Sequence, residues 1–201
     1  MNRIITIGRE FGSGGRELGR KLAAELDIPY YDQEILTQIA QKTELAEEYV
    51  SKVLETERFF YFPVTVGHSF TCMPNLAFDF HEAIYREQHN IIREMAARSD
   101  CIIIGRCADY ILRDLHPLRL FVYAGMQHKI ERCRARNAEE ADLSDKELKN
   151  RIQRIAQGRA KYYRFYTGHV WGAPENYDLC INTSQLEIDD LVKAILPLVA
   201  R

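Results

Sequence analysis

A glycine-rich stretch near the start of the chain has the composition of a phosphate-binding loop. Its members are Gly12, Ser13, Gly14, Gly15, Arg16 and Glu17. They follow the apolar run at residues 4–7 and precede a segment with leucines at helical spacing. Glycines let the backbone turn so that several N–H groups converge at a helix N-terminus, which binds anions such as phosphate. The stretch therefore predicts a phosphate-binding site, and the alternative is a simple strand-to-helix turn.

The loop departs from the regular phosphate-binding pattern G-x-x-x-x-G-K-[ST]. If Gly14 is the second glycine of the pattern, Gly15 stands in place of the lysine. If Gly15 is the second glycine, Arg16 stands in place of the lysine and Glu17 in place of the hydroxyl residue. Arg16 offers phosphate oxygens a permanent charge, although its planar fork is more directional than an ammonium. Glu17 is either a magnesium ligand or a first-turn carboxylate favoured by the helix dipole.

Three cations further along the chain form a second candidate group. Lys129, Arg132 and Arg136 are spaced i, i+3 and i+7, which places them in one stripe of a predicted helix at 127–137. Phosphoryl transfer uses such cations because negative charge spreads over the transferred oxygens. The alternative is a solvated helix face that is balanced by neighbouring glutamates.

Arg106 and Asp32 each follow a predicted strand. Arg106 either grips the phosphate of an acceptor or forms an ion pair with Asp109 or Asp114. Asp32 either orients the acceptor or a magnesium-bound water, or caps a helix over 33–42.

The elements that position these residues alternate along the chain. Apolar runs predict five strands, at residues 4–7, 28–32, 101–104, 118–124 and 178–182. Helical spacing predicts helices at residues 18–26, 34–42, 44–55, 81–98, 109–115, 127–137, 145–163 and 186–199. This alternation indicates an α/β fold with a five-stranded parallel sheet and helices on both faces. Because parallel sheets bind ligands at the carboxyl ends of their strands, we expect the candidate residues to share one edge.

Two segments are expected to cover that edge. Residues 58–80 are rich in aromatic side chains without a sustained period, so an insert at about 44–80 is predicted to be an acceptor-side flap. The alternative is a loop with its own small core, or a subunit contact that makes a homodimer. Basic and aromatic residues around Arg164 indicate a lid at about 137–165 that closes over a triphosphate.

Composition limits the remaining classes of function. The chain has 201 residues, 46% of them hydrophobic, which suits a single domain over residues 1–201. A formal net charge of -2 argues against nucleic-acid or membrane-surface partners. No leader or membrane-spanning run is evident, so we expect a cytoplasmic protein. The five cysteines lack a C-x-x-C motif and are expected to be mainly reduced core thiols, with Cys107 nearest the candidate site.

Taken together, these motifs resemble the cytidylate kinase-like family of P-loop kinases. The segments that carry the resemblance are Gly8 to Arg16, Ile28 to Asp32, Ile103 to Arg106, Tyr162 to Trp171 and Asn176 to Leu179. The resemblance implies a three-layer P-loop kinase fold with an acceptor-binding insert and a lid. It also implies ATP and Mg²⁺ as cofactors and a small phosphorylated acceptor, with CMP or dCMP as the first choice.

The resemblance also implies roles for single residues. The backbone from Gly12 to Gly15 would hold the donor phosphates, and Arg16 would take part of the missing lysine's role. Asp32 would orient the acceptor, and Arg106 would hold its phosphate. Charge neutralisation during lid closure would fall to Arg132, Arg136 and Arg164, the last on the acceptor side.

Two departures from the cytidylate kinases bear on these roles. The loop has no lysine, and Cys107 stands where those enzymes have the aspartate of Gly-Arg-Asp. Two other functions therefore stay open: a nucleotide-binding sensor without catalysis, and a kinase of the same fold for a non-nucleotide metabolite.

Overall fold

The structure is a computed structural model that describes residues 2–47, 50–51, 76–136 and 138–199. Most of the predicted flap at 44–80 lies outside these residues, together with half of the helix predicted at 44–55 and the proposed subunit contact. The described residues contain no helix that is long and apolar enough to cross a membrane.

Five parallel strands form one sheet in the described part of the chain, as predicted. They are β1 (Ile4–Arg9), β2 (Tyr30–Tyr31), β3 (Cys101–Ile104), β4 (Leu118–Tyr123) and β5 (Leu179–Asn182). Their order across the sheet is β2-β3-β1-β4-β5. Ile5 of β1 pairs with Ile102 on one side and Leu118 on the other. Because every pair is parallel, all five strands end at the same edge of the sheet.

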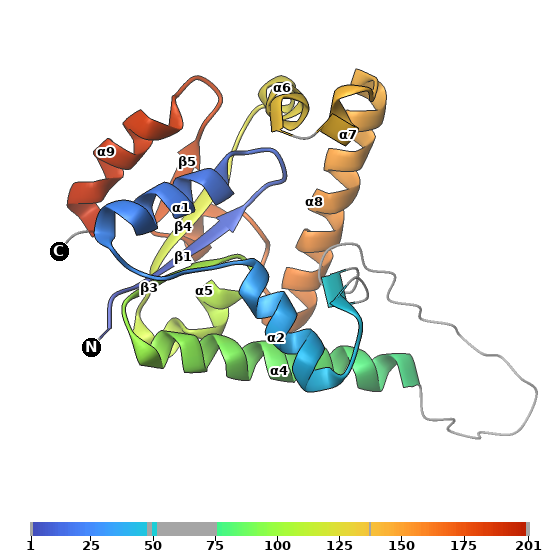
Figure 1. Cartoon of the computed structure of the whole chain (residues 1–201), viewed down its shortest axis with the longest axis vertical. Coiled ribbons are helices and arrows are strands. Elements are labelled where there is room, and N and C mark those ends of the chain that lie inside the picture. Colours follow the sequence, from blue (N-terminus) through green and yellow to red (C-terminus); the bar gives the residue numbers. More distant parts are fainter. Residues whose placement is uncertain (1, 48–49, 52–75, 137, 200–201) are drawn as a thin grey trace, which may run out of the picture.

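Helices lie on both faces of this sheet (Figure 1). The helices are α1 (Gly15–Leu26), α2 (Gln33–Thr43), α4 (Leu76–Arg98), α5 (Ala108–Ile111), α6 (Met126–Arg136), α7 (Ala138–Ala141), α8 (Asp145–Thr167) and α9 (Ile188–Val199). Two 3₁₀ turns, at Arg113–Leu115 and Pro174–Asn176, complete the described elements. The predicted helix at 109–115 is thus α5 followed by a 3₁₀ turn, and the short α7 lies between the predicted helices at 127–137 and 145–163.

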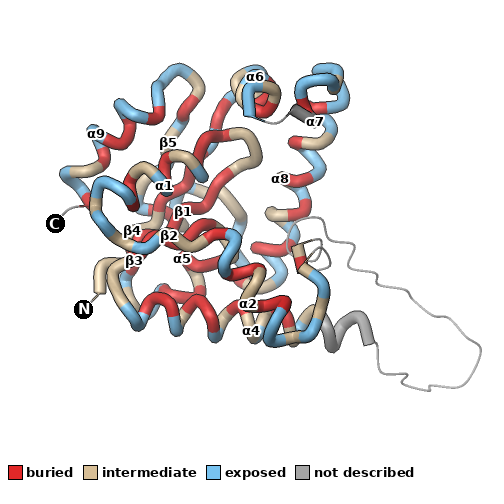
Figure 2. Tube along the Cα trace, in the orientation of Figure 1, coloured by how far each residue is buried: buried red, intermediate tan, exposed pale blue. Residues whose placement is uncertain are grey.

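Alternate residues of the strands supply two separate cores, which appear as buried stripes along the trace (Figure 2). Ile5 and Ile7 of β1 pack with α1 and α9 on one face. Ile103 of β3 packs with α2, α4, α5 and α8 on the other. A smaller cluster joins Ile130 of α6 to Ile152 of α8. These contacts confirm the three-layer arrangement.

The first strand is longer than predicted. Its ladder with β4 continues to the pair Arg9 and Val122, so Gly8 and Arg9 belong to the strand and not to the glycine loop. A Cβ atom on Gly8 would lie 2.9 Å from Cδ2 of Phe121, which explains the glycine by close packing instead of a turn. Among the described cysteines, Cys101, Cys107 and Cys133 are buried as expected, whereas Cys180 is exposed on an edge strand.

The packing of α1 on the sheet generates a stability prediction at Gly19. Ala is the better helix former by about 1 kcal/mol, but a Cβ atom here would lie 2.6 Å from Cδ1 of Ile104. We expect Gly19→Ala to lower the free energy of unfolding by about 1–3 kcal/mol, as overpacking does. Ile104→Val removes the obstructing methyl group, so the double variant should regain part of the loss in urea unfolding. A Gly19→Ala protein as stable as the wild type would contradict this packing.

Candidate active site

The glycine loop connects the end of β1 to the start of α1, and two of its glycines have left-handed backbone angles. Gly12 has φ 75° and Gly14 has φ 82°, and Gly14 is the N-cap of α1. Since the helix begins at Gly15, Gly14 takes the place of the second glycine in the regular pattern. Gly15 therefore stands at the lysine position and Arg16 at the hydroxyl position. The first-turn N–H groups have no acceptor within the helix, which leaves them for an anion.

Carbonyl groups of the loop are held from the side of β5. The hydroxyl of Thr183 donates a hydrogen bond of 2.6 Å to the carbonyl of Ser13. Arg132 donates to the carbonyl of Gly12 at 3.2 Å and to that of Thr183 at 3.1 Å. The hydroxyl of Ser13 donates to the carbonyl of Glu10 at 2.9 Å. These hydrogen bonds hold the loop by its carbonyl groups, which point into the protein. Backbone N–H groups on the opposite side of the loop remain available to bind an anion.

A cavity of about 210 Å³ lies in front of the loop. Arginines dominate its charged lining, which comprises Arg9, Arg16, Arg132, Arg136, Arg159, Glu10 and Glu140. The two acids are already paired, because Glu10 accepts from Lys129 at 2.8 Å and Glu140 lies 3.3 Å from Arg151. Burial, reinforced by Arg136, lowers the pKa of Arg132. The cavity is therefore suited to a multiply charged anion.

Asp32 is the counter-ion of two of these arginines. Its carboxylate lies 3.2 Å from Nη2 of Arg9 and 2.6 Å from Nε of Arg16. Although it occupies the N-cap position of α2, its side chain makes no capping hydrogen bond, so the capping alternative does not hold. Burial opposes the charged carboxylate, yet Arg9, Arg16 and Arg106 together hold its pKa below the usual value. Burial and the nearby Arg159 lower the pKa of Arg9 to about 9.

A second, smaller cavity of about 50 Å³ adjoins the first, and Arg9 and Arg159 line both. Arg106 enters it from the end of β3 with φ 60°, and the buried Nη2 atom of its guanidinium has no hydrogen-bond partner in the part of the chain that the structure describes. The carbonyl of Arg106 accepts from the buried Gln88 at 2.9 Å. An unsatisfied buried donor of this kind fits an anionic group of a ligand.

The ion pairs considered as alternatives for Arg106 are not formed. Asp109 instead accepts a hydrogen bond of 2.6 Å from the hydroxyl of Tyr163, and Asp114 pairs with Arg93 at 2.8 Å. Burial raises the pKa of Asp109 and that of Tyr163. Arg106 is thus directed to the cavity and not to a neighbouring acid.

Comparison with known proteins now gives the family. The sequence profile of the cytidylate kinase-like family matches residues 4–185. The chain belongs to the cytidylate kinase-like family. No curated protein sequence matches it.

Solved structures agree with this family and define the fold. An uncharacterized protein from Eubacterium ventriosum is 26% identical, with a TM-score of 0.71 over 98% of each chain. Shikimate kinase from Bacteroides thetaiotaomicron is 15% identical, with a TM-score of 0.60 over the whole of both chains. Shikimate kinase from Acinetobacter baumannii, solved with shikimate, is 15% identical with a TM-score of 0.55, covering all of this chain and 93% of that one. The fold is therefore that of the P-loop kinases.

A kinase of this family is expected to use magnesium, but the described residues offer the metal no free carboxylate beside the loop. Glu17 pairs with Arg136 and, at 3.2 Å, with Lys21. Arg16 replaces the metal-binding hydroxyl, and Asp32 is held by two arginines. No group of three His, Cys, Asp or Glu side chains suited to a metal occurs in the described part of the chain. The donor set does not fit a protein-bound Mg²⁺, so the structure corrects the assignment of Glu17 as a metal ligand.

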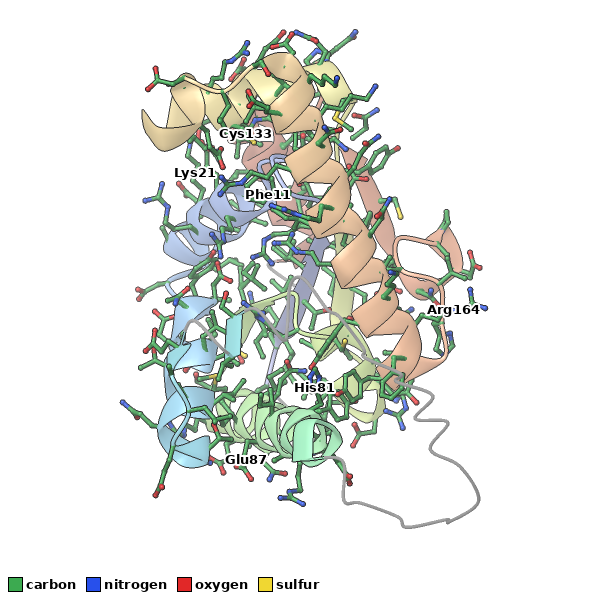
Figure 3. The ribbon with its side chains drawn as sticks, turned by 90° about the vertical axis from the view of Figure 1, so that its right-hand side faces the viewer. Phe11, Lys21, His81, Glu87, Cys133 and Arg164 are labelled. Carbon is green, nitrogen blue, oxygen red and sulfur yellow. The ribbon has the colours of Figure 1, made fainter. Side chains whose placement is uncertain are left out.

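Arg164 is the one predicted site arginine that the structure places elsewhere. It is exposed and points out from α8, away from the loop around Phe11 (Figure 3). Arg164 follows Arg159 by five residues in α8, so the two side chains leave the helix in very different directions. Arg159 lines both cavities. The structure therefore does not bring Arg164 to either cavity, whereas it does bring together Gly12 to Arg16, Arg106, Arg132 and Arg136.

Sequence reasoning did not assign a role to Arg9, and it gave Arg159 only as part of the lid. Arg9 ends a strand whose residues are all buried. A charged residue is unusual in such a position, and this was the signal in the sequence that could have identified Arg9 as a site residue. Arg159 donates a hydrogen bond of 3.1 Å to the carbonyl of Arg9, which ties α8 to the end of β1.

The cluster around Asp32 predicts a stability effect that anions should reverse. Asp32→Asn leaves Arg9 and Arg16 without their counter-ion, and breaking such a buried pair costs about 3–5 kcal/mol. For a chain of this size we expect Tm to fall by roughly 6–20 °C. Added inorganic phosphate should recover more of the Tm in the variant than in the wild type, since it replaces the lost negative charge.

A matched control is Asp114→Asn, which breaks the exposed pair with Arg93. Its expected cost is below about 1 kcal/mol, and phosphate should not reverse it. Equal phosphate responses of the two variants in thermal unfolding would contradict an anion site at Asp32.

Proposed function

We propose that the protein is an ATP-dependent phosphotransferase whose acceptor is a small phosphorylated molecule, with CMP or dCMP as the first candidates. The family and the P-loop kinase fold support the kinase class. The observation that carries the acceptor assignment is the buried Nη2 atom of Arg106, which has no hydrogen-bond partner among the described residues and lies at a cavity that shares Arg9 and Arg159 with the cavity in front of the glycine loop.

On the donor side, the loop and the arginines around it suit the phosphates of ATP. The N–H groups at the start of α1 would bind phosphate oxygens, and Thr183 and Arg132 fix the loop that presents them. Arg16 and Arg136 line the same cavity and would offset negative charge. Bound ATP supplies the phosphoryl group that is transferred.

On the acceptor side, Arg106 and Arg9 would hold the phosphate of the acceptor against the donor cavity. Holding two reactants in a fixed geometry supplies much of the rate in phosphoryl transfer, and neutralising charge supplies most of the rest. Asp32 would act through the arginines that it positions. Magnesium would reach the site with the nucleotide.

The first test is ADP formation from Mg-ATP with CMP, dCMP, UMP, AMP, GMP and shikimate as acceptors, with Tm recorded on the same samples. Turnover with one nucleoside monophosphate is the expected result. ATP at about 100 times its dissociation constant should add about 2.7 kcal/mol, a rise in Tm of roughly 5–11 °C. A rise in Tm with ATP but no turnover would favour a nucleotide sensor. Turnover with shikimate alone would favour a kinase for a non-nucleotide acceptor. No shift would mean that the loop is only a turn.

A variant of Arg106 tests the acceptor assignment. Arg106→Met removes charge-assisted hydrogen bonds, which are each worth about 1.5–3 kcal/mol. We expect kcat/KM for the acceptor to fall roughly 10- to 100-fold while the affinity for ATP changes little. The control is Arg113→Met, because Arg113 is exposed and its guanidinium lies over the ring of Tyr110 outside both cavities. An unchanged acceptor KM in Arg106→Met would contradict the assignment.

A further inference from the structure

The two positions at which the glycine loop departs most from the regular pattern are in contact. With Gly14 as the second glycine of G-x-x-x-x-G-K-[ST], Gly15 holds the lysine position and Arg9 the position of the first glycine. A Cβ atom on Gly15 would lie 2.8 Å from Cβ of Arg9 and 3.4 Å from its Cδ. The side chain of Arg9 therefore fills the space in which the lysine side chain of a regular loop begins.

From this point Arg9 reaches the acceptor cavity. Its Nη1 atom lies 2.9 Å from the place of a Cβ atom on Gly105, at the end of β3, and its Nη2 atom lies 3.2 Å from Asp32. The side chain is 8% exposed and lines both cavities. The guanidinium thus sits at the junction of the donor and acceptor sides.

Among the described residues, Arg9 shares its acidic partner with another arginine. A buried cation is costly unless an anion offsets it, yet the carboxylate of Asp32 is shared between Arg9 and Arg16. Arg106 lies near enough to act on both Arg9 and Asp32 electrostatically. A phosphate at the junction would stabilise these three guanidinium groups.

We propose that Arg9 replaces the lysine of the regular phosphate-binding loop and holds the phosphoryl group that passes between the two cavities. This inference rests on the proposed phosphotransferase function and deepens it. Arg9 supplies the cation from the end of β1, and Gly15 has no side chain because Arg9 occupies its space.

The chemical role of Arg9 is electrostatic. An oxygen of the acceptor phosphate forms a bond to the γ-phosphorus of ATP as the bond from that phosphorus to the β,γ-bridging oxygen breaks. The electron pair of the broken bond leaves with ADP. Arg9 keeps its protons throughout and donates hydrogen bonds to the oxygens on which negative charge spreads.

The test moves the cation from position 9 to position 15, where the regular loop has its lysine. Arg9→Gly, Gly15→Lys and the double variant Arg9→Gly/Gly15→Lys are compared with the wild type, with ATP affinity measured by calorimetry and folding by circular dichroism and Tm. Arg9→Gly should bind ATP at least about tenfold more weakly, since a charge-assisted contact is lost. Gly15→Lys should also bind weakly because its stem meets Arg9. The double variant should recover about tenfold or more over the weaker single variant, and turnover should follow the same order.

Each outcome bears on the proposal. Wild-type ATP affinity in Arg9→Gly, or a double variant no better than the weaker single variant, would overturn it. If the wild type binds ATP but phosphorylates no acceptor, the proposed function fails while the affinities still decide the role of Arg9. A wild type that does not bind ATP overturns both. Arg9→Gln, which keeps a polar side chain without the charge, repeats the affinity measurement if Arg9→Gly does not fold.

Discussion

The carboxylate of Asp32 accepts ion pairs from Arg9 at 3.2 Å and from Arg16 at 2.6 Å, in a place where water reaches little of either the acid or Arg9. Removing water strengthens both the attraction within each pair and the repulsion among the arginines. Because one carboxylate serves both Arg9 and Arg16, a second anion at this place would stabilise the two arginines further. An anion that enters the site therefore completes an arrangement that the fold has already built, and binding and stability are linked there.

The order of strands explains why these groups meet. Asp32, Arg106 and Arg9 stand at the ends of β2, β3 and β1, which are neighbours in the sheet. Thr183, which fixes the glycine loop, follows β5 on the opposite side of β1. The sheet thus separates a half rich in charge from a half that anchors the loop. Arg9 lies on the central strand, and its position on that strand gives it access to both halves.

Much of the fold follows from patterns in the sequence, because apolar runs and helical spacing report burial on one face. The strands at 101–104 and 118–124 and the long helix ending at Arg98 are predicted within a few residues. Strand order and ion-pair partners depend instead on contacts between distant segments. The pairing of Asp32 with Arg9 and Arg16 could therefore not be predicted from the sequence. The register of the loop was ambiguous since Gly14 and Gly15 are adjacent, and only the start of α1 decides it.

The same contacts bear on the choice of acceptor. The shikimate kinases share the fold at 15% identity, so the fold does not select a substrate. Charge is more informative: a phosphate dianion offsets two positive charges at the junction, whereas a carboxylate offsets one, which favours a phosphorylated acceptor. Cys107 follows Arg106, and burial raises the pKa of its thiol, so it stays neutral where an aspartate would be charged. We infer that the site is built to fix the phosphate of its acceptor, and that the residue after Arg106 adds no negative charge to it.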